Sequence, residues 1–288
     1  MWFGLALLSA LFQVLRNMSM KHLGQTLDDT INVWGRFTFL LPFVAGFVLW
    51  HGIPPLRPGF WLYVALFGVA QTAATLSLAK ALRLSDISMV TALWKVSLLF
   101  LVVFAFLSLG ERPSLLGVVG ILVSLAGVYL LNVQKSRLSL WAPLRELLID
   151  RGLRYTLLAA VLYAPAVVII KQIILRSDAY FANLMAYSAA SLVILPLALR
   201  RSAHHFVQIP RHWPSFVGMG AFACLASVCH SLAYQMTLTS YVEAAKQAEV
   251  LFALGIGYVV FQEQARVRAI LPGSLVILLG MVLLHLSG

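Results

Sequence analysis

The sequence predicts an all-α integral membrane protein with ten transmembrane helices, arranged as two inverted repeats of five helices. Three observations support this prediction. The 288-residue chain is 61% hydrophobic and only 11% charged, with a mean hydropathy of +0.91, whereas a soluble domain has roughly 25% charged residues. The apolar residues fall into long runs, and the second half of the chain repeats landmarks of the first half.

Each apolar run is long enough to cross a bilayer, which takes about 20 residues of helix. Turn-forming and charged residues separate the runs: Asp28-Asp29 follows the first, Pro54-Pro55 the second and Pro113 the fourth. The expected transmembrane helices span residues 2–22, 31–50, 60–79, 87–109, 114–133, 155–175, 180–199, 214–236, 241–261 and 269–287.

Landmarks of the first half recur in the second at offsets of 150 to 154 residues. The corresponding pairs include Lys21 and Lys171, Leu84 and Leu238, Glu111 and Glu263, Gly120 and Gly273, and Gly127 and Gly280. Because five is an odd number of crossings, the second repeat must insert upside down relative to the first. We expect a first repeat at 1–133, a hydrophilic linker at 134–154 and a second repeat at 155–288.

The net charge of +11 reflects short basic loops between apolar runs, so we predict no nucleic-acid partner. Thirteen Lys and Arg residues lie on the side opposite the termini, three lie on the terminal side and five lie within helices. The thirteen are Lys21, Lys80, Arg83, Lys135, Arg137, Arg145, Arg151, Arg154, Arg200, Arg201, Arg211, Arg266 and Arg268, and the three are Arg57, Arg112 and Arg176. We expect the protein in the cell inner membrane. The positive-inside rule then predicts that the linker is cytoplasmic and that both termini lie on the opposite, outer side of this membrane.

The linker has an amphipathic pattern of its own. Leu140, Trp141, Leu144 and Leu148 follow helical spacing, opposed by charged residues such as Arg145. This pattern predicts a short helix lying at the membrane interface. A plain basic loop is the alternative.

Four ionisable residues fall inside predicted spans: Lys95 in 87–109, and Glu243, Lys246 and Glu249 in 241–261. A charge at the bilayer centre costs about 2.5–3.5 kcal/mol, so such residues face a cavity or a partner. Lys95 and Glu249 are equivalent in the two repeats, and we expect them to face each other across the central cavity near the midplane. Lys246 and Glu249 are spaced to share one helix face, and Glu243 lies near a helix start, where the helix dipole favours a carboxylate.

Two interpretations of these charges stay open. In the first, they line a polar cavity for a small-molecule substrate that is charged or zwitterionic, and Glu249 carries a coupling proton. In the second, they form a fixed Lys–Glu pair that joins the repeats, where losing one partner would leave a costly lone charge. The first interpretation is favoured.

Weaker candidates for the same cavity are Gln71 and Thr75, four residues apart on one face, together with His230 and Trp94. Trp94 could stack on a cationic or aromatic ligand. For each of them, packing or hydrogen bonding between helices is the favoured explanation, and contact with a ligand is the alternative.

Other residues are assigned structural roles. Arg16, Arg36 and Lys171 lie within a turn or two of helix ends and are expected to extend to the interface. The small residues Gly117, Gly120, Gly127, Gly273 and Gly280 are expected to permit close helix approach. Glu111 and Glu263 are expected to cap or turn helix ends.

The chain resembles the EamA-type members of the drug/metabolite transporter superfamily. The resemblance rests on the doubled five-helix pattern, on Leu109-Gly110-Glu111-Arg112, and on Glu249-Val250-Leu251-Phe252 followed fourteen residues on by Glu263. Val250 replaces a proline that is usual in the family, and Gln262 replaces a glycine.

The resemblance implies a secondary carrier for small metabolites or drugs, often an exporter. It singles out Arg36, because an arginine early in the second helix is familiar in the family. It also implies cytoplasmic termini, against the charge count.

The function expected from the sequence is secondary transport by alternating access around a central cavity, because inverted repeats place the substrate site where the halves meet. The chain has no Walker loop, no His-Glu-x-x-His and no Gly-x-Ser-x-Gly motif, so we expect no cofactor and no enzymatic activity. An intramembrane lipid-processing enzyme and a non-transporting membrane partner protein are the alternatives.

Overall fold

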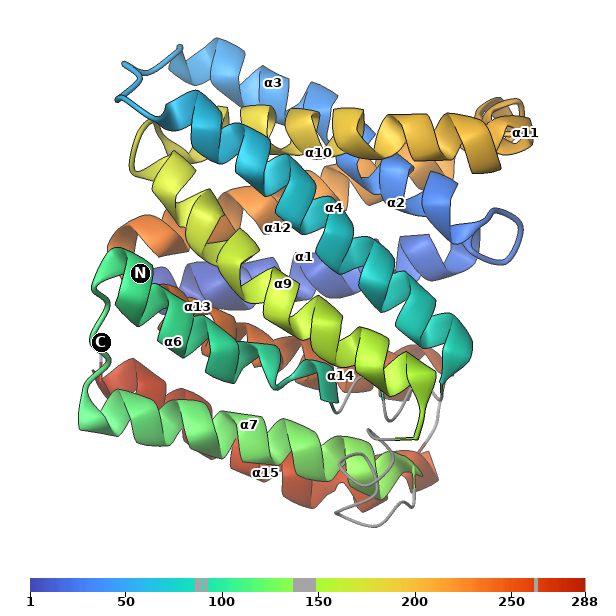
Figure 1. Ribbon diagram of the computed structural model, residues 1–288. Helices are drawn as coiled ribbons and strands as arrows, with labels where there is room; N and C mark the ends of the chain where they lie inside the picture. Colours follow the sequence, from blue (N-terminus) through green and yellow to red (C-terminus); the bar gives the residue numbers. More distant parts are fainter. Residues whose placement is uncertain (86–89, 91–92, 137–148, 262–263, 288) are drawn as a thin grey trace.

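The computed structural model describes residues 1–85, 90, 93–136, 149–261 and 264–287, and among these the secondary structure is helical, with no strand (Figure 1). The helices are α1 (Trp2–Leu23), α2 (Asp29–Thr38), α3 (Leu41–His51), α4 (Phe60–Leu84), α6 (Ser97–Leu109), α7 (Leu115–Ser136), α9 (Arg151–Ile174), α10 (Ala179–Arg201), α11 (Ala203–Phe206), α12 (Trp213–Met236), α13 (Thr239–Ala245), α14 (Glu249–Phe261) and α15 (Gln264–Ser287), with 3-10 turns η1 (Ile209–His212) and η2 (Lys246–Ala248). The predicted interfacial helix of the linker and the predicted turn role of Glu263 lie outside the described residues.

Six helical stretches of the described chain are long and apolar enough to cross a membrane, with α2 and α3 counted together. Shorter apolar helices lie at Ser97–Leu109, Leu115–Leu130 and Gly273–Ser287. These findings make the protein a multi-pass membrane protein. Helix is present in all ten predicted ranges, but six strong spans do not establish ten crossings, which stay a prediction.

Three of the predicted helices are not continuous, which corrects the sequence prediction for 31–50, 87–109 and 241–261. The chain turns at Phe39-Leu40 between α2 and α3, and at Lys95-Val96 before α6. The tight turn η2 separates α13 from α14. Pro42 lies in the first turn of α3, where its fixed φ and missing N–H suit a helix start. The other two breaks hold charged residues, and irregular backbone at membrane depth is tolerated where it lines a polar cavity.

Aspartate side chains start three of the helices. Asp28 accepts a hydrogen bond from the Ile31 amide at 2.9 Å, and Asp178 accepts one from Phe181 at 2.6 Å. Asp150 caps α9 in the same way. A side-chain oxygen at this position satisfies an amide that has no partner within the helix. Asp28 and Asp178 lie 150 residues apart, so equivalent aspartates start α2 and α10.

The most extensive helix contacts join the two halves: α4 packs on α9, α1 on α12 and α7 on α15. The sequence offset makes α9 the counterpart of α1 and α12 the counterpart of α4. The α1–α12 contact is therefore the image of the α4–α9 contact, as a two-fold relation requires. In Figure 1, α7 and α15 run in opposite directions. This packing fits a two-repeat architecture.

Glycines allow the close approach of α7 and α15. A Cβ atom on Gly127 would stand 2.6 Å from the amide nitrogen of Ile277, and one on Gly280 would stand 2.5 Å from that of Ser124. A Cβ on Gly120 would lie 2.9 Å from Leu284 Cγ. The predicted role of these glycines in helix packing is confirmed.

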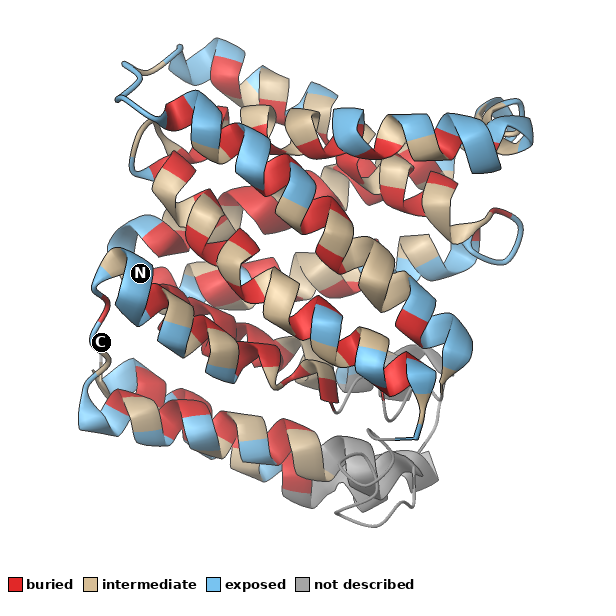
Figure 2. Ribbon diagram, viewed as in Figure 1, coloured by how far each residue is buried: buried red, intermediate tan, exposed pale blue. Residues whose placement is uncertain are grey.

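The outward faces of the helices are apolar, as a lipid-facing surface requires. Exposed residues cover the outside of the bundle in Figure 2, and many of them are large hydrophobics. Leu49 is 87% exposed, Leu107 71% and Leu192 66%. A soluble monomer rarely exposes so much contiguous apolar surface.

Candidate functional site

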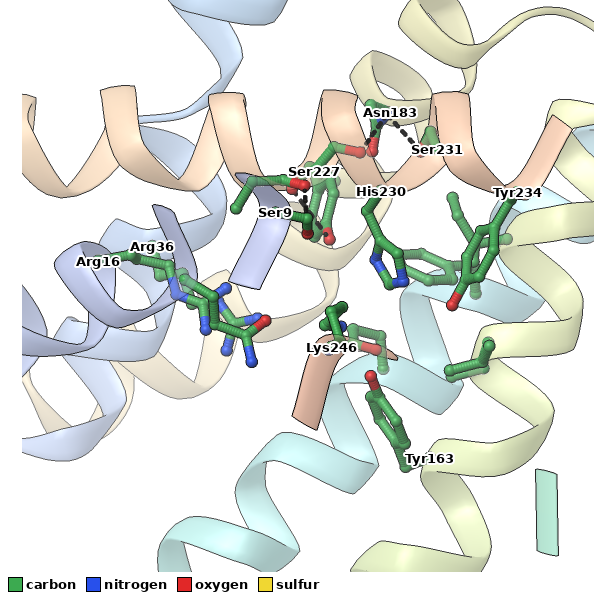
Figure 3. Close-up of a pocket in the computed structure, with 18 residues that line it drawn as sticks. Ser9, Arg16, Arg36, Tyr163, Asn183, Ser227, His230, Ser231, Tyr234 and Lys246 are labelled. Atoms are coloured by element: carbon green, nitrogen blue, oxygen red, sulfur yellow. Dashed lines mark hydrogen bonds between the residues drawn. The ribbon is translucent and has the colours of Figure 1, made fainter. Parts of the chain in front are cut away.

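Two adjoining cavities lie where the halves meet. The first, of about 60 Å³, is lined by residues of α1, α2, α4, α9, α10 and α12 and by Lys246 of η2 (Figure 3). The second, of about 40 Å³, includes Lys95 and Glu249 in its lining. Gln13, Tyr163 and Lys246 line both cavities and form the wall between them.

Lys95 and Glu249 form a salt bridge between the two halves. The Lys95 Nζ atom lies 2.9 Å from Oε1 of Glu249, and the two side chains are 9% and 21% exposed. The Gln13 amide donates a hydrogen bond to the other carboxylate oxygen. These residues are 154 apart, the offset that made them equivalent in the duplication, and both lie at helix breaks that the sequence did not predict. They are in direct contact instead of facing each other across a space.

Lys246 forms its ion pair with Glu243, which the sequence did not predict. The Lys246 Nζ atom lies 3.1 Å from Oε1 of Glu243. Lys246 lies in η2 and Glu249 begins α14. Both side chains line the second cavity, in agreement with the shared face predicted for them.

Glu243 is the most connected carboxylate of the site. Tyr234 donates to Oε1 at 2.7 Å, and the Tyr163 hydroxyl lies 3.4 Å from the same atom. His230 brings Nε2 to 2.8 Å from Oε1, off the direction of an aligned hydrogen bond. The sequence predicts Glu243 near a helix start, stabilised by the helix dipole. In the structure Glu243 lies late in α13, and the side chains of Tyr234 and Lys246 stabilise it instead.

The other predicted site residues divide between the cavities. Trp94 lines the second cavity, with its ring centroid 5.0 Å from that of Tyr163. Gln71, His230 and Arg36 line the first. Thr75 lines neither cavity, because its hydroxyl donates to the Gln71 carbonyl at 2.7 Å within α4.

Arg16 lines the first cavity instead of extending to the membrane interface, contrary to the prediction. Arg16 is 7% exposed and lines the first cavity beside Arg36. Arg16 lies seven residues before the end of α1, on the face that packs against the second half. Figure 3 shows Arg16 and Arg36 at one end of the cavity, with His230 and Tyr234 toward the other.

Lys171 binds Glu111, and the predicted capping role of Glu111 is confirmed. The Lys171 Nζ atom lies 2.8 Å from Oε1 of Glu111. The Glu111 carboxylate accepts hydrogen bonds from the Thr239 amide at 2.9 Å and from its hydroxyl at 2.8 Å. A residue of the first half thereby caps α13 of the second half.

Comparison with known proteins gives the family. The profile of the EamA-like transporter family matches residues 1–133 and 150–286, nearly the whole chain in two parts. This chain belongs to the EamA-like transporter family. That family is part of the drug/metabolite transporter superfamily, so the resemblance predicted from the sequence is confirmed and the protein is a membrane transporter.

Two further comparisons agree with this placement of the EamA-like chain. An "uncharacterized transporter in cobO 3'region" from Sinorhizobium sp is 33% identical over 136 residues, which make up 96% of that relative and 46% of this chain. One solved crystal structure superposes with a TM-score of 0.74 at 17% identity, covering 99% of this chain and 95% of its own. At that identity the likeness shows the fold alone.

Sequence reasoning missed several polar residues that line the cavities of this EamA-like transporter: Gln13, Tyr163, Asn183 and Tyr187. The duplication held a signal for the first two, since Gln13 and Tyr163 are 150 residues apart and occupy equivalent places on α1 and α9. Asn183 is 1% exposed and donates to Ser231 Oγ at 2.7 Å, which no sequence pattern indicated.

Proposed function

We propose that this EamA-like protein is a secondary transporter that exports a small polar metabolite across the inner membrane by alternating access. Two inverted repeats, at 1–133 and 155–288, would rock around the paired cavities, joined by the linker at 134–154. The observation that carries the proposal is the interruption of the fourth helix of each half at equivalent places. Interrupted helices at corresponding positions of two repeats are typical of transporter substrate sites.

The Lys95–Glu249 contact supports a site that changes during transport. Lys95 belongs to the first half and Glu249 to the second, and both lie at the helix breaks. If the halves rock apart, the pair must separate. Each separated charge then needs water, a proton or the substrate, because an uncompensated charge at this depth is costly. Glu249 is accordingly proposed to carry the coupling proton.

The size of the cavities supports a conformational change. A cavity of about 60 Å³ has room for roughly four water molecules. A metabolite needs several times that volume, since ligand pockets measure about 300–1,000 Å³. Substrate entry is therefore proposed to require the halves to open further on one side.

The test is solute flux in proteoliposomes, with and without a proton gradient, together with a charge swap. Lys95→Glu and Glu249→Lys are each expected to lose gradient-driven flux and much of the expression level. The double variant restores the pair and is expected to recover expression. The solute must be recovered chemically unchanged. Full flux in both single variants, or chemical conversion of the solute, would overturn the proposal.

A further inference from the structure

Two arginines that line the first cavity, the buried Arg16 and the half-buried Arg36, form no ion pair with an acidic residue among the described residues. The Arg16 guanidinium donates to the neutral amide oxygen of Asn17, at 3.2 Å from Nε and 2.8 Å from a terminal nitrogen. The Arg36 guanidinium lies 5.6 Å from the centre of the Phe37 ring. Every described ion pair involves other cations.

The charges around the two cavities do not balance. Four cations line them, Arg16, Arg36, Lys95 and Lys246, against the two carboxylates of Glu243 and Glu249. Each carboxylate already lies within 3.1 Å of a lysine. Among these six side chains two positive charges are left over, and both belong to the arginines.

The other acidic residues of the described chain do not neutralise the two arginines, because they lie at helix ends and bind partners of their own. These acids are Asp28, Asp29, Glu111, Asp150 and Asp178. An uncompensated guanidinium inside a membrane protein is costly. The site therefore calls for an anion from outside the chain.

We propose that the Arg16–Arg36 end of the cavity binds an oxyanion, a carboxylate or phosphate group, of the transported metabolite. This inference rests on the proposed transport function and names the substrate class. Arginine suits the task because its planar fork donates two parallel hydrogen bonds to a carboxylate or phosphate. Two such forks at one end of the cavity offer more donors than one oxyanion needs.

The rest of the cavity lining fits an uncharged remainder of the metabolite, beyond the oxyanion that the arginines bind. Asn183, Ser227 and Tyr187 place polar side chains along one wall. Val167 and Ile170 of α9 line the same cavity with apolar surface. Lys246 lies beyond, toward His230, and is engaged by Glu243. The anionic group is thus fixed at the arginines, which bind it more strongly than any neutral group nearby.

The experiment measures binding without transport, using acetate and inorganic phosphate as probes. Each is titrated into purified protein in sodium chloride at constant ionic strength, and the thermal unfolding midpoint is recorded. Wild type is expected to show a saturable upward shift with at least one probe. Arg16→Gln and Arg36→Gln are each expected to weaken that binding by roughly 30-fold or more. Arg16→Lys keeps the charge without the fork and is expected to weaken it less.

Two controls separate binding from salt effects and from structural damage. Arg211→Gln removes an exposed arginine and is expected to respond like wild type. Without the probes, Arg16→Gln and Arg36→Gln are expected to unfold at the same temperature as wild type or higher, because each removes a cavity-lining charge that has no ion-pair partner among the described residues. A lower unfolding temperature in both would assign the arginines to the fold and overturn the inference.

The outcomes distinguish this inference from the transport proposal. A shift with acetate alone or with phosphate alone supports it and identifies the oxyanion. The absence of a saturable shift with either probe in wild type overturns it, whatever the flux experiments give. Binding that is lost in both arginine variants, in a protein that moves no solute, would uphold the anion site and overturn transport.

Discussion

Glu243 and Glu249 lie six residues apart in one interrupted helix but have different surroundings. Glu249 has one lysine partner, across the boundary between the halves, and its side chain is 21% exposed. Glu243 is held by Lys246 and Tyr234 and is 9% exposed. Both of these partners come from its own half of the chain. We therefore expect Glu249 to change partners during transport and Glu243 to keep the local fold.

Replacing Glu249 with Gln tests its coupling role. The substitution keeps the size and a hydrogen-bond acceptor for Gln13 but removes the group that takes up a proton. We expect the variant to insert and fold, to lose solute accumulation driven by a pH gradient, and to retain exchange of solute on both sides. Flux assays in proteoliposomes with an imposed gradient measure both activities. Undiminished gradient-driven accumulation would leave Glu249 with a structural role only.

Replacing Glu243 with Gln tests whether its contacts with Lys246 and Tyr234 stabilise the fold. The change leaves Lys246 as a lone buried charge, and breaking a buried pair in this way costs about 3–5 kcal/mol. A markedly lower thermal unfolding midpoint in detergent is expected. The double variant Glu243→Gln with Lys246→Met removes both charges and should regain most of the lost stability. An unchanged midpoint in the single variant would contradict the assignment.

At the scale of the helices, the glycine contact between α7 and α15 is the feature that the sequence predicted best. The aspartate caps were not predicted, although Asp28 and Asp178 precede apolar runs and lie 150 residues apart, which is the offset of the duplication. The helix breaks were less visible. Only the one after Phe39 has a proline beside it, whereas no turn-forming residue marks Lys95-Val96 or η2.

Asp28 predicts a stability change with pH. Partial burial raises the pKa of its carboxyl, but hydrogen bonds from Ser202 and the Ile31 amide outweigh this and lower the pKa overall. A lowered folded-state pKa contributes stability that is present above the ordinary aspartate pKa and is lost as the pH falls through the folded value, below about pH 4.

We therefore expect Asp28→Ala to lower the unfolding temperature at pH 7, as loss of a cap that contributes about 1 kcal/mol. The difference from wild type should shrink as the pH is lowered through 4 to 3. Asp28→Asn keeps a good capping group that does not titrate, so its stability should lack this acid-side dependence. If the unfolding temperatures of wild type and Asp28→Asn fall equally as the pH is lowered from 4 to 3, then Asp28 does not cause the pH dependence.

The α7–α15 contact predicts a strong response to one methyl group. In Gly127→Ala the new Cβ would stand 2.6 Å from the Ile277 amide nitrogen, which belongs to helix backbone and cannot rotate away. We expect a loss of about 1–3 kcal/mol in stability, typical of overpacking. Gly218→Ala in α12 is the matched control, since no atom lies within 4 Å of its new Cβ. Equal melting temperatures for the two variants would contradict the close packing.

For the whole molecule, the duplication predicted more than any single motif. An offset between equivalent residues fixes their depth in the membrane, and so it brought Lys95 and Glu249 to the same level. The offset does not fix the direction in which a side chain points, because each residue of a helix turns by about 100°. The sequence therefore did not predict that Lys246 pairs with Glu243 or that Arg16 lines the first cavity. Those contacts required the structure.

The orientation of the molecule follows from where its basic residues lie. In Figure 1 both termini and the loop after α3 lie at one end, and the loops after α1 and α10 lie at the other. Arg200, Arg201 and Arg211 belong to that second end, whereas Arg57 and Arg176 belong to the first. Because basic loops are retained in the cytoplasm, we expect the termini outside the cell and the linker inside.

Cysteine labelling in intact cells tests this orientation. In a background where Cys224 and Cys229 are replaced by Ala, a membrane-impermeant maleimide should label Leu56→Cys, in the exposed loop between α3 and α4. It should label Ser139→Cys, in the linker, only after the membrane is permeabilised. The two cysteines are expected on opposite sides of the membrane. An inactive reagent would label neither of them, and this result differs from the expected one. The reverse pattern would place the termini in the cytoplasm and show that the basic loops do not set the topology, while every helix contact described above would stand.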